Sequence, residues 1–259
     1  KTLDVDSTAL GFSGGFPGDF IAQTLEDSNT QSDFVQVDED TRINVKLKSG
    51  QETEINAPGP KVTHAQFEQL LSQIRRTTND DIVIVAGSVP NSIPSDAYAQ
   101  IAQITEKTGA QLVVDAEKDL VETVLPYRPL FIKPNKDELE VMFNTTVKSD
   151  EDVIKYGKEI LKKGAQSVII SLGGDGAIYV DQHQSIKAVN PQGHVVNTVG
   201  SGDSTVAGMV AGLSMGLNVD EAFQQAVASG TATAFSEDLA TRDAIENIKS
   251  QVTISVLDG

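Results

Sequence analysis

The sequence predicts an α/β protein with a mostly parallel central sheet, and three observations support this class. Short apolar runs such as Ile82–Ala86 and Ser167–Ser171 have the composition of strands that are buried on both faces. Segments with apolar residues three and four positions apart, which predict amphipathic helices, alternate with these strands. Glycine and polar turns separate the two kinds of segment. This alternation predicts a parallel sheet covered by helices on both faces.

The elements can be assigned in order along most of the chain. The first are the end of a strand at residues 9–12, a turn at 13–18 and a helix at 19–25. Further helices are expected at residues 63–75, 94–107, 136–143, 150–162, 201–215, 219–236 and 242–251. Buried strands are expected at residues 82–86, 111–115, 130–133 and 167–171, and antiparallel edge strands at 177–180 and 185–189.

The segment between the first two helices has a different pattern. Three short β-prone stretches with alternating polar residues lie at residues 34–37, 41–47 and 51–55, with a hairpin turn at 48–50. Half-exposed strands of this kind predict a small antiparallel sheet set apart from the core. We therefore expect one core, residues 1–32 and 57–259, with residues 33–56 as a separate β segment.

Composition limits the classes of function. The 259 residues include 20 Lys and Arg against 37 Asp and Glu, a net charge of −17, which argues against nucleic acid and anionic membranes as partners. The absence of Cys excludes disulfides and thiolate metal sites. No apolar run is long enough to cross a bilayer and no signal peptide is visible, so we expect a soluble, cytoplasmic protein. The chain opens at Lys1 in mid-pattern, which predicts a missing N-terminal piece.

The most informative stretch is NTVGSGDSTVAGMVAGL, residues 197–213. A turn of small residues, Gly200, Ser201 and Gly202, leads directly into a helical pattern. Unpaired amides and the positive end of a helix dipole bind anions such as phosphate. Asp203 adds a carboxylate that could accept a proton beside that anion, which is what phosphoryl transfer to an alcohol needs. The alternative, that Asp203 only caps the helix, stays open.

Other polar turns follow the predicted strands, at Gly87-Ser88, Asp115, residues 133–135 and residues 171–173. In an open α/β sheet, ligands bind beyond the carboxyl ends of the strands, so these turns and the Gly200 turn are expected to surround one site. No G-x-x-x-x-G-K-[ST] motif is present, so the site is not a P-loop.

Several candidates have a structural and a functional interpretation. Asn135 and Glu138 are spaced as a helix cap and its reciprocal partner, and they would also suit hydrated Mg²⁺ near phosphates. Residues 171–176 fit either a hairpin turn or a nucleotide contact. Arg42 lies on a polar-alternating strand, and its guanidinium suits a substrate phosphate. Gly230 and the neighbouring alanines predict either close helix packing or a flat adenine pocket.

These motifs together resemble the ribokinase-like carbohydrate kinases, the phosphofructokinase B family. NTVGSGDSTVAG resembles the family signature Asp-Thr-x-Gly-Ala-Gly-Asp, with Asn197 and Ser201 in place of Asp and Ala. KPNKDEL, SLGGDGA, AGSVPNSIP and ASGTATAF resemble further family segments, so the likeness extends over the whole chain. GFSGGFPGDFI, TRINVKL and QETEINAPGP resemble the members that phosphorylate fructose 1-phosphate or tagatose 6-phosphate.

The resemblance implies a three-layer α/β/α sandwich, with residues 33–56 as a β-lid over the sugar and a possible homodimer through the lid. It implies an ATP-dependent kinase that converts fructose 1-phosphate to fructose 1,6-bisphosphate. Tagatose 6-phosphate is the alternative substrate, and a catalytically silent sugar-phosphate sensor is the alternative class. Family members open with a strand carrying a sugar-binding Asp and a Gly-Gly-Lys-Gly-x-Asn turn, which are not found here, so the resemblance implies an incomplete N-terminus.

The resemblance also implies roles for individual residues. Asp203 would be the general base, and the amides of Gly200, Ser201 and Gly202 would form the anion hole. Mg²⁺ would lie near Asn135 and Glu138, held through water. The substrate side would comprise Gly14, Gly15, Arg42, Asn44 and Asn56, and the nucleotide side Lys133, Asn135, Ser171, Gly173, Gly176, Thr198 and Gly230. Some members build a monovalent-cation site at the first Asp of the signature. Because Asn197 replaces that Asp, the resemblance does not decide whether this chain has such a site.

Overall fold

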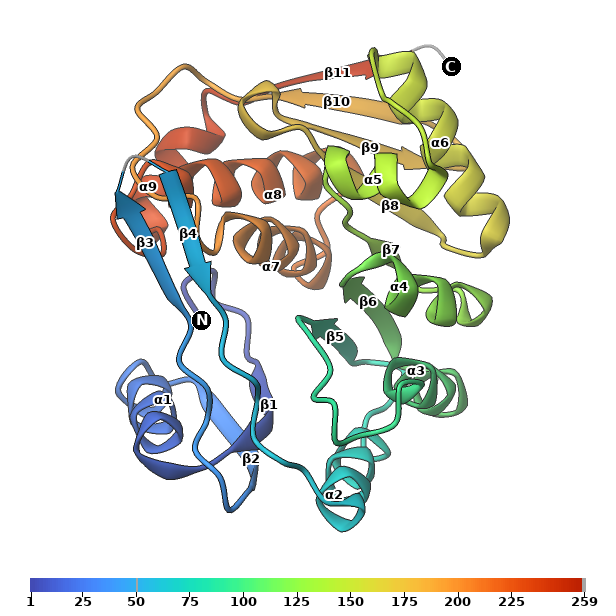
Figure 1. The fold of residues 1–259 in the computed structure, drawn as a ribbon. Helices are drawn as coiled ribbons and strands as arrows, with labels where there is room; N and C mark the ends of the chain where they lie inside the picture. Colours follow the sequence, from blue (N-terminus) through green and yellow to red (C-terminus); the bar gives the residue numbers. More distant parts are fainter. Residues whose placement is uncertain (50, 258–259) are drawn as a thin grey trace.

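The fold consists of three layers, in which helices cover both faces of a seven-stranded sheet (Figure 1). The computed structural model describes residues 1–49 and 51–257. The predicted α/β/α class is confirmed. Among the described residues, no helix has the length and apolar character needed to cross a membrane.

The strands are β1 Thr8–Ser13, β2 Gln31–Gln36, β3 Val45–Ser49, β4 Gln51–Ile55, β5 Ile82–Ala86, β6 Gln111–Asp115, β7 Phe131–Ile132, β8 Ser167–Ser171, β9 Ala177–Asp181, β10 Ser185–Val189 and β11 Thr253–Leu257. The helices are α1 Gly15–Asp27, α2 His64–Ile74, α3 Ala97–Thr108, α4 Lys118–Val124, α5 Lys136–Phe143, α6 Asp150–Lys163, α7 Ser201–Ser214, α8 Val219–Ala234 and α9 Arg242–Lys249.

The large sheet has the strand order β11-β10-β9-β8-β7-β6-β5. Strands β5 to β8 pair in parallel, and β9, β10 and β11 are added in antiparallel pairing at one edge. The carboxyl ends of β5 to β8 therefore meet along one edge of the sheet, which is where the sequence places its polar turns.

The sheet separates two hydrophobic cores. Successive strand residues point to opposite faces, so that Leu112 and Val114 pack on one side of β6 while Val113 packs on the other. Helices α2 to α6 supply the first core, and α7, α8 and α9 supply the second. Burial on both faces explains why these strands are continuous apolar runs.

The N-terminal part differs from the prediction in two respects. Residues 34–37 were expected in the small antiparallel sheet, but β2 pairs in parallel with β1, and Val35 is fully buried. The expected turn at residues 13–18 is also wrong, because α1 begins at Gly15. Pro17 lies in its first turn, where helical N–H groups have no intrahelical acceptor, so the proline removes no hydrogen bond.

The predicted antiparallel hairpin is confirmed as β3 paired with β4, from Val45 opposite Ile55 to Ser49 opposite Gln51. Its first strand begins at residue 45 and not at 41, and residues 48 and 49, expected in the turn, belong to β3. Gly50, in the predicted hairpin turn, lies outside the described residues. Figure 1 shows this hairpin extending away from the β1–β2 pair, which itself lies apart from the seven-stranded sheet. Two elements, α4 and β11, were not predicted; β11 pairs with β10 at the sheet edge.

Helices α7 and α8 pack with their backbones unusually close. A Cβ atom on Gly208 would lie 2.8 Å from Cα of Ala226, and one on Gly212 would lie 2.8 Å from Cα of Ala222. Gly230 of α8 faces α7 in the same way, since its Cβ would lie 2.2 Å from Oγ1 of Thr205. Close packing therefore accounts for the small residues of α8, and an adenine contact at Gly230 stays a prediction.

We expect Gly208→Ala to lower the free energy of unfolding by about 1–3 kcal/mol, the usual cost of overpacking, although alanine is the better helix former. Chemical denaturation measures this change. Gly174→Ala is the matched control, because a Cβ there meets nothing within 4 Å, and its effect should stay within about 0.5 kcal/mol. Unchanged or increased stability of Gly208→Ala would contradict the close packing.

Candidate active site

The N-terminus of α7 carries the features expected of an anion site. Gly200 precedes the helix with φ of 79°, a left-handed conformation that favours glycine. The Ser201 amide donates to the Thr198 carbonyl at 3.2 Å, so one of the three predicted anion-hole amides is used within the turn. The amides of Gly202 and Asp203 have no acceptor in residues 1–49 and 51–257. These two, with the helix dipole, are free to bind an anion.

Asp203 lies in the first turn of α7, and its side chain is exposed. The helix has no side-chain capping hydrogen bond, so the alternative that Asp203 merely caps α7 is not supported. Asp203 is therefore an accessible base next to unpaired amides.

Asn197 joins this turn to the loop after α8. Its Nδ2 donates to the Glu237 carbonyl at 3.1 Å, and its Oδ1 accepts from the Val199 amide at 3.2 Å. The side-chain amide thus bonds to a backbone carbonyl from the position where the family signature has a carboxylate. This contact ties together two loops that border the start of α7.

Lys133 and Asp115 form a buried ion pair beside the same turn. Lys133 follows β7, Asp115 ends β6, and their Nζ and Oδ1 atoms are 3.3 Å apart. The side chains are only 7% and 18% exposed. A Cβ on Gly202 would lie 3.3 Å from Nζ of Lys133, so the ammonium lies against the backbone at the start of α7. The predicted convergence of strand ends is thereby confirmed at β6 and β7.

The charges around Asp115 act on its pKa in both directions. Burial raises the pKa of Asp115, the ammonium of Lys133 lowers it, and the carboxylates of Asp203 and Glu138 raise it. Burial raises the pKa of Tyr98 to about 12, and the carboxylate of Asp115 adds to this rise. The site therefore combines one buried ammonium with three carboxylates within electrostatic range.

Asn135 and Glu138 form the helix cap that the sequence allows. Oδ1 of Asn135 accepts from the Glu138 amide at 2.8 Å, and Oε2 of Glu138 accepts from the Asn135 amide at 2.7 Å. Within the described ranges, no group of three His, Cys, Asp or Glu side chains could hold a metal ion. A Mg²⁺ ion here would thus depend on phosphate oxygens and water, which suits its chemistry. The predicted Mg²⁺ role of this pair remains a prediction.

The predicted nucleotide loop is held by a residue that sequence reasoning missed. Nδ2 of Asn190 donates to the Gly173 carbonyl at 3.0 Å, and its Oδ1 accepts from the hydroxyl of Thr231 at 2.9 Å. Gly173 has φ of 60° and space around its Cα, whereas a Cβ on Gly176 would lie 1.9 Å from the Ala188 carbonyl oxygen. Gly173 is therefore open to a ligand, while packing requires Gly176.

Ser171 and Thr198 complete the predicted nucleotide side. Ser171 forms a parallel bridge to Asn135, which joins the ends of β8 and β7. Thr198 is exposed, and its carbonyl accepts from Ser201. Both residues lie at the expected edge of the sheet, and their contact with a nucleotide stays a prediction.

Arg42 lies at the same edge, because its Nη2 donates to Oγ of Ser88 at 3.0 Å. Ser88 follows β5, and the neighbouring Gly87 carbonyl accepts from the hydroxyl of Tyr98 at 2.9 Å. The Arg42 side chain thus connects the base of the hairpin to the core. Ser88 and Tyr98 were not predicted as site residues, although Gly87-Ser88 was among the strand-end turns.

Gly14 and Gly15 are explained by contacts within the chain. A Cβ on Gly14 would lie 2.2 Å from the Glu39 carbonyl oxygen, and one on Gly15 would meet the side chain of Asp40. Thr41 bonds to Gly14 twice, since its amide donates to the Gly14 carbonyl and its Oγ1 accepts from the Gly14 amide. These bonds place the residue next to Arg42, and direct sugar contact by the two glycines remains a prediction.

Asn44 and Asn56 lie on either side of the hairpin, one before β3 and one after β4. Both side chains are exposed. The structure thus places them at the base of the predicted lid, together with Arg42, and their role in substrate binding is not tested.

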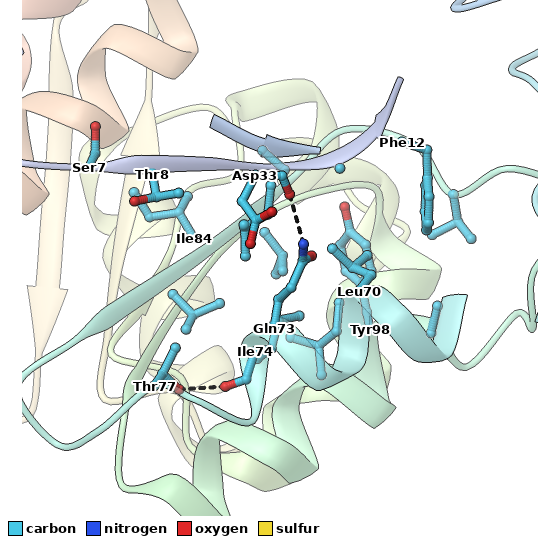
Figure 2. A pocket seen from close by; sticks show the side chains of 18 of the residues that line it. Ser7, Thr8, Phe12, Asp33, Leu70, Gln73, Ile74, Thr77, Ile84 and Tyr98 are labelled. Atoms are coloured by element: carbon cyan, nitrogen blue, oxygen red, sulfur yellow. Dashed lines mark hydrogen bonds between the residues drawn. The ribbon is translucent and has the colours of Figure 1, made fainter. Parts of the chain in front are cut away.

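A cavity of about 1160 Å³ has neither Lys133 nor Asp203 in its lining. It lies between β1 and β5, and Arg42 and Ser88 are among the residues that line it. Figure 2 shows Gln73 reaching across it to the backbone of Asp33, and Oε1 of Gln73 is buried without a hydrogen-bond partner. Lys133 and Asp203 are therefore separate from this cavity, whereas Arg42 lines it.

The chain is similar to known carbohydrate kinases. The sequence profile of pfkB family carbohydrate kinases matches residues 1–244. The chain is 42% identical over 257 residues to a 1-phosphofructokinase of Bacillus subtilis (strain 168), covering 99% of this chain and 85% of the relative. It is 37% identical over 258 residues to a D-tagatose-1-phosphate kinase of Bacillus licheniformis, covering 99% and 85%.

A solved structure is similar over the whole chain. It belongs to a Staphylococcus aureus protein provisionally named a phosphofructokinase, with 79% sequence identity and a TM-score of 0.91. The match covers 100% of this chain and 84% of the other.

Proposed function

Since the chain belongs to the pfkB family of carbohydrate kinases, we propose that it transfers the terminal phosphoryl group of ATP to fructose 1-phosphate, giving fructose 1,6-bisphosphate. The observation that carries this function is the exposed Asp203 carboxylate beside unpaired amides and the buried ammonium of Lys133. A base next to an anion site is the arrangement that phosphoryl transfer to an alcohol requires.

Asp203 accepts the proton of the sugar's free primary hydroxyl as that oxygen attacks phosphorus. The amides of Gly202 and Asp203 donate to the transferring phosphoryl group, and the helix dipole favours its negative charge. Lys133, held against Gly202, adds a positive charge at the same place. Mg²⁺ bound with ATP would neutralise phosphate charge, and Asn135 and Glu138 would hold it through water.

Arg42 binds the phosphate that the sugar already carries. Its guanidinium can donate two parallel hydrogen bonds to phosphate oxygens. The bond to Ser88 orients this side chain at the carboxyl edge of the sheet. Asn44 and Asn56, at the base of the hairpin, contact sugar hydroxyls in this proposal, and the β3–β4 hairpin acts as the lid.

A second substrate is D-tagatose 1-phosphate, because one relative of 37% identity carries that name. Tagatose 6-phosphate uses the same machinery. A sensor without catalysis would retain Arg42 but would not need Asp203. We also propose a cytoplasmic location, in keeping with an ATP-dependent metabolic kinase, and a homodimer formed through the β3–β4 hairpin.

A substrate panel tests the function. ADP release is measured with fructose 1-phosphate, D-tagatose 1-phosphate, tagatose 6-phosphate and fructose 6-phosphate, using the protein as it is expressed at full length. We expect the highest kcat/KM with fructose 1-phosphate. A higher value with a tagatose phosphate would change the substrate, and binding without any turnover would favour the sensor.

We expect Asp203→Asn to lower kcat by about 10²–10⁴-fold, the usual contribution of general base catalysis, with little change in the KM for ATP. The coupled ADP-release assay measures both constants. Asp243→Asn, the same change in the first turn of α9, is the control and should leave kcat unchanged. Near-normal turnover of Asp203→Asn would remove Asp203 from this role.

We expect Arg42→Ala to raise the KM for the sugar phosphate by about 10- to 100-fold, since a hydrogen bond to a charged group contributes ~1.5–3 kcal/mol. The KM for ATP should change little. Arg75→Ala removes another exposed arginine, paired with Glu68 on α2, and should leave both KM values unchanged. Equal effects of Arg42→Ala on the two substrates would indicate a structural role.

A further inference from the structure

The buried ammonium of Lys133 lies in an environment that would not stabilise it without a partner. Its side chain is 7% exposed, so it has lost most of its water. It also lies against Gly202, where the backbone dipole presents positive charge. A cation so close to a helix N-terminus is repelled by it, and only an opposing negative charge can keep it there.

Asp115 is the side chain that supplies this negative charge. Its Oδ1 is 3.3 Å from Nζ of Lys133. Asp115 ends β6 and Lys133 directly follows β7, and these two strands are parallel neighbours. Glu138 also acts on this region, but its carboxylate accepts from the Asn135 amide as part of the cap of α5. Asp203 is exposed and belongs to α7 itself.

The absence of a side chain at Gly202 completes the arrangement. A Cβ there would lie 3.3 Å from Nζ of Lys133, which is closer than most Cβ contacts, and 3.6 Å from its Cε, which is an ordinary contact. The glycine thus lets the ammonium reach the first turn of α7. Asp115, Lys133 and Gly202 come from three separate elements, and together they fix one positive charge beside the amides of Gly202 and Asp203.

We propose that Asp115 is a positioning residue for phosphoryl transfer, which holds Lys133 against the start of α7 so that its ammonium contacts the transferring phosphoryl group. This role rests on the proposed kinase function. Asp115 does not touch the substrates. It holds the ammonium in place before ATP binds, and the incoming phosphate then contacts the same ammonium.

A double-mutant cycle of Asp115→Asn and Lys133→Met tests the proposal. With fructose 1-phosphate and ATP, Lys133→Met should lower kcat by about 10²–10³-fold, the usual cost of removing one preorganised donor. Asp115→Asn should lower kcat by about 10-fold or more, within the range in which contacting residues couple, with the KM for the sugar phosphate unchanged. In the Lys133→Met background, Asp115→Asn should have no further effect, which a merely structural role would not produce.

For the same four proteins, calorimetry measures the affinity for a non-hydrolysable ATP analogue in the presence of Mg²⁺. Asp115→Asn should weaken binding several-fold in the presence of Lys133 and not in its absence. This readout needs no turnover, so it decides the role of Asp115 even if the sugar-phosphate assay fails. Glu122→Gln is the control, because it removes the partner of Lys163 in an exposed ion pair, and it should change neither measurement.

Two results would overturn the proposal. One is a kcat and an analogue affinity of Asp115→Asn within about twofold of the unaltered protein. The other is an equal loss caused by Asp115→Asn with and without Lys133. If the unaltered protein turns over normally, either result would reject the role of Asp115 and would not affect the proposed kinase function.

Discussion

The ammonium of Lys133 and the backbone at the start of α7 lie in contact, and the carboxylate of Asp115 balances the charge they bring together. Two positive features are held side by side in a place that is largely shielded from water. Such an arrangement is stable only with a fixed negative partner, and it attracts any further anion strongly. The other proposed functions of the site follow from it. A phosphoryl group bound there lies next to Asp203, which is exposed and carries no capping hydrogen bond.

The fold produces this contact through its topology. Parallel pairing of β5 to β8 brings Ser88, Asp115, Lys133 and Ser171 to one edge of the sheet. The close packing of α7 on α8, which depends on Gly208, Gly212 and Gly230, fixes where the start of α7 lies relative to that edge. The β3–β4 hairpin is joined to the same edge by the bond from Arg42 to Ser88. Residues far apart in sequence are thereby placed around one site.

Local sequence patterns predicted most of the fold and the turn that precedes α7. The apolar strands, the antiparallel edge and the turn before α7 could be assigned because each depends on neighbouring residues. The pairing of β2 with β1 was missed, because a six-residue strand does not encode its partner or direction. The ion pair was also missed, although Asp115 ends one buried strand and Lys133 follows another. Asp115 and Lys133 are 18 residues apart in the sequence, and only the adjacency of β6 and β7 brings them together. Asn190 is likewise positioned by Thr231 and the Gly173 carbonyl, which no local pattern reveals.

The central claim is that the start of α7 and Lys133 together bind the phosphoryl group that is transferred. A crystal structure with Mg²⁺, fructose 1-phosphate and a non-hydrolysable ATP analogue tests it most directly. We expect the terminal phosphate to accept hydrogen bonds from the amides of Gly202 and Asp203 and to contact Nζ of Lys133, with the Asp203 carboxylate facing the sugar's free primary hydroxyl. A terminal phosphate bound away from this turn, with Lys133 still paired only with Asp115, would contradict the account.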